Sequence, residues 1–199
     1  MSEFKQPACV IIKHAIPCGV SEKINLKKPW KNAYLADELS AFGGVVCFNR
    51  TVDVEVANLL TKIFLEVVAA PSFTKEALQI LQKKINLRVL KIKSIKGYAQ
   101  SSKKQITMLS NSFLLQDRDK SILKINQLKL VSKKKPNSKQ LEDLLFANKV
   151  VKYVRSNAIV LDKKKTKLSI GSGNTNRVDS VNFAIKKSSS VISKNNKNI

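Results

Sequence analysis

Apolar residues along the chain are arranged in two kinds of pattern. Residues 8–12, 45–48, 66–70 and 87–92 form short, mainly apolar runs with β-branched side chains, which are typical of buried strands. Between these runs, apolar residues recur every three or four positions, which is the period of an amphipathic helix. Strands that alternate with such helices predict an α/β layered domain, with a parallel or mixed sheet covered on both faces.

Four helices are predicted from capping residues and apolar stripes. Asp53 and Thr74 can each cap a helix, and Asn137 and Ser138 are alternative caps for a third helix over about 139–154. The fourth helix follows a glycine-rich segment near the end of the chain. The residues predicted to face inward are, in chain order, Val56, Leu59, Leu60, Ile63 and Phe64; Leu78 and Leu81; Leu141, Leu144, Leu145, Val151 and Val154; and Val178, Val181, Ala184 and Ile185.

The remaining segments are predicted to be turns, loops and a tail. A Pro-Cys-Gly sequence at residues 17–19 predicts a turn after the first strand, and residues 27–30 predict a loop. The polar stretch from about 94 to 120 predicts a loop-rich insertion. Two apolar runs flank the lysines at 163–165 and predict a hairpin. The Lys/Ser/Asn-rich residues 188–199 predict a disordered tail.

The charge is strongly basic, with 37 Lys and Arg against 14 Asp and Glu and a formal net charge of +23. Many lysines lie in short runs beside Ser and Asn, such as 133–135, and such runs are typical of solvated loops. Aromatic residues make up 6% of the chain and are not interleaved with the lysines, which disfavours a base-stacking surface. Nucleic-acid binding is therefore the minor alternative, and a steep salt dependence of DNA affinity would support it.

Cys9, Cys18 and Cys47 are odd in number and have no C-x-x-C spacing, which disfavours a disulfide framework and a thiolate zinc site. The amino-terminal residues contain no long apolar core of the signal-peptide kind, and no run approaches the roughly 20 apolar residues of a membrane span. We therefore expect a cytoplasmic protein that uses neither a metal nor a membrane.

The single histidine, His14, follows Lys13 at the end of the first apolar run. Successive side chains of a strand point to opposite faces, so these two residues can serve one site only from the end of the strand. In open α/β sheets, ligands bind outside the carboxyl ends of strands. The pair could supply a cation and a base there. A surface lysine beside a hydrogen-bonded histidine is the simpler interpretation of the spacing alone.

Other candidate positions are individually weak. Residues 169–177 place two glycines before a helix start, where backbone N–H groups and Arg177 could bind an anion, but an ordinary turn has the same pattern. Phe42 precedes two glycines and could stack on a planar ligand that approaches the backbone. Glu66 and Asn157 each begin a strand, where they could orient a substrate or merely hydrogen-bond a loop.

Taken together, six blocks resemble one known family. They are VIIKHAIPCGV, AYLADELSAFGGVVCFNRTVD, FLEVVAAPSFTKEALQILQKKINLRVL, FLLQDRD, LEDLLFANKVVKYVRSNAIVL and IGSGNTNRVDSV. In this order and spacing they are similar to the transformylase part of the bifunctional AICAR formyltransferase/IMP cyclohydrolase family. Residues 1–187 are accordingly interpreted as a partial AICAR transformylase domain, in which about 94–137 is variable and loop-rich.

The resemblance implies formyl transfer from 10-formyltetrahydrofolate, as cosubstrate, to the 5-amino group of AICAR in purine biosynthesis. It also implies a cytidine-deaminase-like, three-layer α/β/α fold with a mixed sheet. Zinc deaminases of that fold carry P-C-x-x-C, and the sequence after Pro17 and Cys18 lacks the second cysteine, in keeping with a family that uses no metal. AICAR and folate are the implied ligands, and a homodimer or a complementary chain is the implied assembly.

The resemblance also assigns roles to individual residues. His14 would take a proton from the attacking amine, Lys13 would stabilise charge on the formyl oxygen, and Asn157 would orient the formyl carbonyl. The residues implied to bind substrate are Phe42, Gly43, Glu66, Gly171, Gly173 and Arg177.

Several departures from the family pattern lead to an alternative. Asn111 and Ser112 replace glycines, and Asn148 replaces an aromatic residue. We also expect the cyclohydrolase domain and the last part of the transformylase to be absent from this chain. A catalytically inactive remnant or split-gene subunit, which binds nucleotide or a partner chain, is therefore the second hypothesis.

Overall fold

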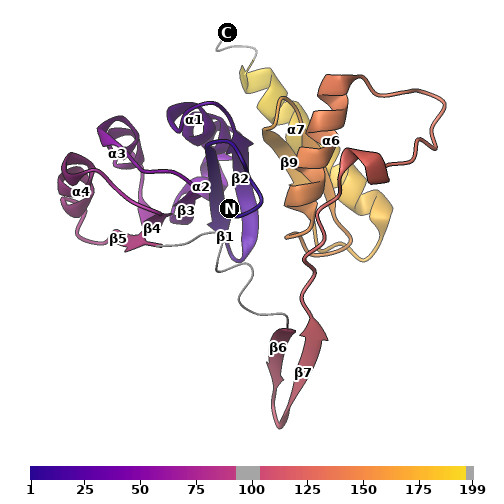
Figure 1. Cartoon of the computed structure of the whole chain (residues 1–199), viewed down its shortest axis with the longest axis horizontal. Coiled ribbons are helices and arrows are strands. Elements are labelled where there is room, and N and C mark those ends of the chain that lie inside the picture. Colours follow the sequence, from indigo (N-terminus) through magenta and orange to yellow (C-terminus); the bar gives the residue numbers. More distant parts are fainter. Residues whose placement is uncertain (93–103, 196–199) are drawn as a thin grey trace.

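The computed structural model describes residues 1–92 and 104–195 and contains a five-stranded mixed sheet (Figure 1). Its strands are β1 (Ala8–Lys13), β2 (Ile16–Glu22), β3 (Gly44–Phe48), β4 (Leu65–Ala70) and β5 (Arg88–Lys91), in the spatial order β2-β1-β3-β4-β5. β1 is antiparallel to both of its neighbours, whereas β3, β4 and β5 are parallel. The four predicted strands all form, and the α/β class is confirmed.

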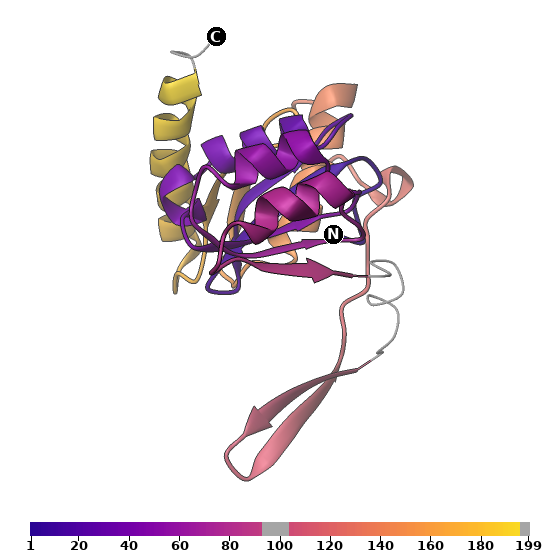
Figure 2. The same cartoon turned by 90° about the vertical axis from the view of Figure 1, so that its left-hand side faces the viewer.

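Four helices cover one face of this sheet: α1 (Lys27–Leu35), α2 (Glu38–Ala41), α3 (Val54–Leu60) and α4 (Lys75–Gln82) (Figure 2). Trp30, Val56 and Leu81 pack there against Ile11 and Phe48 of the sheet. The predicted caps are confirmed, since Asp53 accepts a hydrogen bond from the Val56 N–H and Thr74 accepts one from the Ala77 N–H. Each cap satisfies a backbone donor that the first helical turn leaves free.

A second unit covers the other face of β1 and β2. It consists of helix α6 (Ser138–Val151), the antiparallel hairpin of β8 (Ile159–Asp162) and β9 (Lys167–Gly171), and helix α7 (Arg177–Asn195). Asn137 is the cap of α6, in a reciprocal capping box with Gln140. The side chains that join α6 and β9 to the sheet are Val10, Val20, Phe146, Val150 and Ile170.

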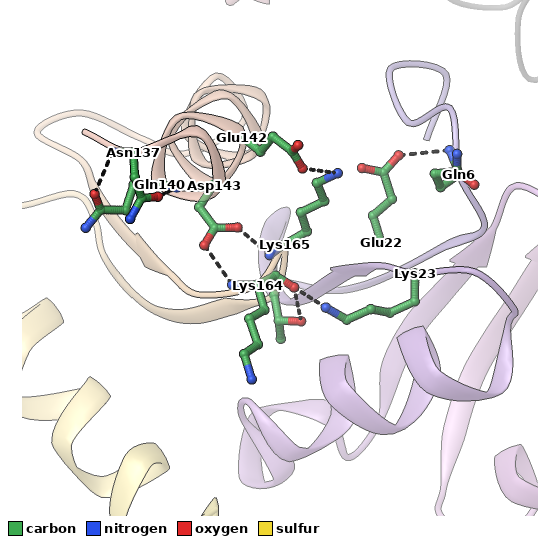
Figure 3. A network of polar contacts seen from close by, with 10 residues as sticks. Gln6, Glu22, Lys23, Asn137, Gln140, Glu142, Asp143, Lys164 and Lys165 are labelled. Carbon is green, nitrogen blue, oxygen red and sulfur yellow. Dashed lines mark hydrogen bonds and ion pairs between the residues drawn. The ribbon is translucent and has the colours of Figure 1, made fainter. Parts of the chain in front are cut away.

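The turn of the β8–β9 hairpin is held against α6 and the edge of β2 (Figure 3). Lys164 and Lys165 have φ angles of 52° and 51°, and both of their N–H groups donate to the Asp143 carboxylate at 2.8 Å. Lys23 donates to the Lys164 carbonyl oxygen, and Lys165 pairs with Glu142 at 2.8 Å. The predicted hairpin across the lysine turn is confirmed. These contacts place β9 antiparallel to β2, so that the end of β9 lies beside the β1–β2 turn.

Two predicted breaks near the start of the chain are wrong. The first turn lies at His14 and Ala15, with φ angles of 52° and 61°, and residues 17–19 belong to β2. Gly19 lets α1 approach, because a Cβ there would lie 2.3 Å from the Ala33 carbonyl oxygen. Residues 27–30 form the start of α1 rather than a loop, since Pro29 in a first helical turn has no intrahelical N–H bond to lose.

The inward faces of three helices differ from the prediction. α3 ends at Leu60, so that Phe64 lies beyond it and is exposed. α6 buries Phe146 and Val150, while Leu144 is exposed. The third difference is in α7, where the close contact with β9 selects the face with small residues. Val178, Val181 and Ile185 are exposed there, and the buried residues are Ser180, Ala184, Ser188 and Val191.

Two predicted irregular segments contain regular structure. The described part of the insertion, from residue 104, forms an antiparallel hairpin of β6 (Lys104–Leu109) and β7 (Ser112–Asp117), while residues 94–103 lie outside the described residues. A short 3₁₀ helix, η1 (Ile125–Gln127), follows it. The predicted tail continues α7 to Asn195, because Val191 gains a buried position against the body; residues 196–199 lie outside the described residues.

Candidate functional site

Lys13 is the last residue of β1, and His14 forms the turn that follows it. Because β1 is antiparallel to β3, its carboxyl end lies at the amino ends of β3 and β4. The left-handed φ of His14 interrupts the strand alternation that would otherwise direct the two side chains to opposite faces. Both side chains consequently line one cavity of about 220 Å³.

The cavity brings together four separate parts of the chain. The β1–β2 turn forms one wall, α2 forms the second, and β9 with its following loop and α7 form the others. The polar and aromatic side chains on these walls are Lys13, His14, Asp37, Ser40, Lys167, Ser172, Phe183 and Lys187. A cavity with several convergent polar groups is the ordinary form of a small-molecule site.

Lys13 is held toward the glycine turn before β3. Its ammonium donates a hydrogen bond to the Phe42 carbonyl oxygen at 2.5 Å, which, among the residues that the structure describes, leaves two of its three N–H donors for a ligand. Gly43 has a φ of +68°, and its N–H donates to the Phe64 carbonyl oxygen at 2.9 Å. The rings of Phe42 and Phe64 lie 5.4 Å apart. Three of the predicted site residues, Lys13, Phe42 and Gly43, are thus brought together.

Glu66 is the exposed second residue of β4, and the preceding Leu65 pairs with Gly44. It therefore lies at the same end of the sheet as Lys13. Phe64 and Leu65 also line a second cavity, of about 270 Å³, between the end of α3 and the α4–β5 loop. Glu66 itself is on the lining of neither cavity.

Asn157 holds the glycine-rich loop rather than lining the cavity. Its amide donates to the carbonyl oxygens of Asn174 and Thr175, both at 3.0 Å, and these two bonds use both amide hydrogens. Its own carbonyl oxygen accepts from the Ser180 hydroxyl at 2.9 Å. Asn157 therefore fixes the loop that carries Ser172 to the cavity.

The two glycines of the loop have different physical roles. A Cβ at Gly171 would lie 1.9 Å from the Ser180 carbonyl oxygen, so this glycine permits close packing of α7 on β9. Gly173 has a φ of +71° with open space around it. The Asn176 side chain accepts a hydrogen bond from the Asp179 N–H at 2.8 Å and so caps the start of α7. Arg177 begins α7 and is exposed.

The electrostatics of the cavity depend on residues that the sequence did not single out. Lys167 is buried, and its ammonium donates to the Cys18 carbonyl oxygen at 2.6 Å. Burial lowers the pKa of Lys167 to about 8, although Asp37 opposes this shift. Burial has the opposite effect on the pKa of the Cys18 thiol, which it raises, and the charge of nearby Lys167 reduces this rise. Nothing in the strand pattern of β9 distinguishes such a lysine from a solvated one.

Asp37 connects α2 to α7 across the cavity. Its carboxylate accepts from Lys187 at 2.5 Å and from the Ser40 N–H at 3.3 Å. Burial by itself would raise the pKa of Asp37, but the hydrogen bonds from Lys187 and Ser40 outweigh it and hold the pKa below its usual value. The cavity therefore contains the Asp37 carboxylate, which is paired with Lys187, and the further lysines Lys13 and Lys167.

Within residues 1–92 and 104–195, no group of three or more His, Cys, Asp and Glu side chains is placed to hold a metal ion. No helix in the described part of the chain is both long and apolar enough to cross a bilayer.

Comparisons with known proteins give one consistent result. The family model described as AICARFT/IMPCHase bienzyme matches residues 1–187. The protein named bifunctional purine biosynthesis protein PurH from Persephonella marina is 47% identical over 188 residues, which cover 94% of this chain and 36% of the relative. Its namesake from Caldicellulosiruptor bescii has the same identity and coverage. The one from Bacillus cereus is 43% identical over 185 residues. The chain spans just over a third of the length of these relatives.

Proposed function

Because this chain belongs to the AICARFT/IMPCHase bienzyme family, we propose that it carries the formyl-transfer site for AICAR with 10-formyltetrahydrofolate as cosubstrate. The observation that supports this proposal most directly is the position of Lys13 and His14 on one cavity, together with Ser172 of the glycine-rich loop. AICAR and folate are accordingly its proposed ligands, and a second copy or a complementary chain is its proposed partner.

The proposed reaction needs a base and a cation on the two sides of one carbon atom. The 5-amino nitrogen of AICAR attacks the formyl carbon, and the C=O electron pair moves onto the oxygen. His14 takes the proton that the nitrogen loses, and the two uncommitted N–H donors of Lys13 stabilise the oxyanion. The oxyanion then re-forms the C=O bond as the C–N bond to the folate breaks, and His14 returns the proton it took to the leaving nitrogen.

The substrate-binding assignments differ in the support they receive. Phe42 and Gly43 lie against Lys13 and could form the wall beside the reacting atoms. Glu66, at the same end of the sheet as Lys13, and Arg177, at the start of α7, are exposed but line neither cavity, so their contact with substrate is proposed from the family alone. Asn157, Gly171 and Gly173 would act indirectly, by shaping the loop that carries Ser172. We therefore propose Asn157 as a positioning residue, since the direct role predicted from the family would require its amide to release the loop.

The test is formylation of AICAR by the purified chain. We expect Lys13→Ala and His14→Ala to reduce kcat by roughly 100-fold or more, which is the scale of one lost acid–base or oxyanion group. Lys28→Ala, at an exposed lysine on α1, is the matched control and should retain activity. Activity that survives in both site variants would refute their proposed roles.

A nucleotide-binding chain without turnover is the second candidate. It is favoured by the engagement of both Asn157 amide hydrogens in the loop. Calorimetry with AICAR separates the two candidates. Binding without formylation would favour the second, and failure of AICAR to bind would exclude both.

A further inference from the structure

The second cavity, of about 270 Å³, is larger than the cavity of about 220 Å³ that Lys13 and His14 line. It lies beyond the carboxyl ends of α3 and α4, two helices that lie side by side on one face of the sheet (Figures 1 and 2). Residues 60–65 form one wall, and residues 84–87 form the other. None of these lining residues has a part in the proposed chemistry.

Phe64 connects the second cavity to the reacting groups. It belongs to the lining of this cavity, and it is 43% exposed. Its ring lies 5.4 Å from the ring of Phe42, at an interplanar angle of 46°. A Cβ placed on Gly43 would lie 3.7 Å from the Phe64 ring and 3.9 Å from the Lys13 ammonium, so both groups flank the same glycine. A ligand that reacts at Lys13 can therefore extend across the two rings into the second cavity.

The charged side chains on the lining of the second cavity, among the described residues, are the two lysines Lys62 and Lys84. Both are exposed, and no salt bridge in the described part of the chain involves either one. The Asn86 amide adds further hydrogen-bond donors. Glu66 lies outside the lining, because strand alternation directs it to the face opposite Leu65. The second cavity therefore offers two cations and an amide to an anionic group.

The two ligands of the proposed reaction differ in how they fit this arrangement. The polar cavity that His14 lines suits the amino, carboxamide and ribose groups of AICAR. The folate carries its formyl group on a nitrogen bonded to a benzoyl ring, and an amide links this ring to a glutamate with two carboxylates. A formyl group held at Lys13 places the benzoyl ring beside the two phenylalanine rings, where aromatic groups associate favourably. The carboxylates then reach the lysines of the second cavity.

We propose that the second cavity is a glutamate site, in which the ammonium groups of Lys62 and Lys84 bind the carboxylates of the folate cosubstrate and Phe64 contacts its benzoyl ring. This inference rests on the proposed formyl transfer, because it assigns a site to the second reactant of that reaction. The glutamate does not change during the reaction. The two lysines therefore contribute equally to the binding of the ground state and of the transition state.

The first test is the steady-state kinetics of Lys62→Ala/Lys84→Ala. We expect the KM for 10-formyltetrahydrofolate to rise roughly fivefold or more, while kcat and the KM for AICAR change by less than about twofold. Lys75→Ala/Lys83→Ala removes the same charge from exposed positions that line neither cavity, and it should leave all three values unchanged. Lys62→Arg/Lys84→Arg keeps both cations and should retain the KM for the folate. A rise in the KM for AICAR instead would assign the cavity to the nucleotide phosphate and overturn the proposal.

The second test needs no turnover and uses calorimetry with folic acid and with pteroic acid, which lacks the glutamate. We expect folic acid to bind the unsubstituted chain several-fold more tightly, and this difference to narrow as salt is added and to disappear in Lys62→Ala/Lys84→Ala. Equal binding of the two compounds, or binding of neither, would overturn the glutamate site even if the chain formylates AICAR. The expected difference in a chain that does not formylate AICAR would support the glutamate site and refute formyl transfer.

Discussion

The buried ammonium of Lys167 donates a hydrogen bond to the carbonyl oxygen of Cys18 at 2.6 Å, across 149 residues of sequence. A longer bond, at 3.5 Å, reaches the Ala36 carbonyl oxygen at the end of α1. β9 is thereby joined to β2 and α1 directly behind the turn that carries His14. A buried lysine that keeps its charge has a measurable cost, and this cost makes the contact testable.

The stability cost of Lys167 should depend on pH. The unfolded chain keeps this proton up to about pH 10.5 but the folded chain only up to about pH 8, so stability rises with pH between these values. The cost is complete below pH 8. The Lys167→Met variant has no such cost. The free energy of unfolding of the wild type, relative to that of the variant, should therefore rise by about 3 kcal/mol as the pH rises through this window. Urea unfolding of both proteins at the two ends of the window measures the change, and an unchanged difference would refute it.

Asp162 should be destabilising in its charged form. Burial and the charge of Asp143 raise the pKa of Asp162 to about 7, and its Oδ2 atom is buried without a hydrogen-bond partner in the described structure. The folded chain therefore binds more protons than the unfolded chain between about pH 3.8 and 7, and stability falls with pH there.

The matching substitution is Asp162→Asn. After allowance for solvent screening of a half-buried group, we expect it to stabilise the protein by about 1 kcal/mol above pH 7, or about 2–4 °C in Tm, and by much less near pH 5. Asp143→Asn should destabilise at both pH values, because it weakens the acceptor of the Lys164 and Lys165 N–H groups. Thermal unfolding at the two pH values checks both variants. A stability gain that is the same at both would argue against titration of Asp162.

The two glycines of the loop should respond differently to the same methyl group. Gly171→Ala places a Cβ 1.9 Å from a backbone oxygen of α7, which can only be relieved by moving the helix, and we expect a loss of about 3 kcal/mol. Gly173→Ala meets no neighbour and should lose only about 1 kcal/mol through its left-handed φ. The free energies of unfolding in urea distinguish the two. Equal losses would mean that α7 adjusts freely.

Lys187→Met should destabilise the protein, because it removes the ammonium group that pairs with the Asp37 carboxylate. The Asp37 side chain is 8% exposed, and removing Lys187 leaves its carboxylate with a weaker set of donors, so we expect a loss of about 2 kcal/mol near neutral pH. The lowered pKa of Asp37 means that this stabilisation is lost as the pH falls through the folded-state value, and the penalty should shrink in acid. The exposed neighbour Lys186→Met removes the same charge and is the control in pH-dependent urea unfolding.

Local sequence signals succeeded where one short segment decides the outcome. Asp53, Thr74 and Asn137 cap helices as predicted, because a cap needs only the three residues that follow it. Local signals gave a wrong prediction where packing against a distant segment decides which face of a helix is buried. The apolar stripe on α7, formed by Val178, Val181 and Ile185, predicts an inward face, but these side chains are exposed. The opposite face packs inward because the small side chains of Ser180 and Ala184 allow α7 to approach β9 more closely.

The sequence by itself determined the four buried strands at residues 8–12, 45–48, 66–70 and 87–92, and it placed Lys13 and His14 at the end of the first, because periodicity and strand alternation are local properties. Only the tertiary structure decided that Asp37, Lys167 and Lys187 share the cavity with them. These residues come from three distant elements, and whether a charged side chain is solvated or buried depends on the surfaces that pack around it rather than on its neighbours in the chain.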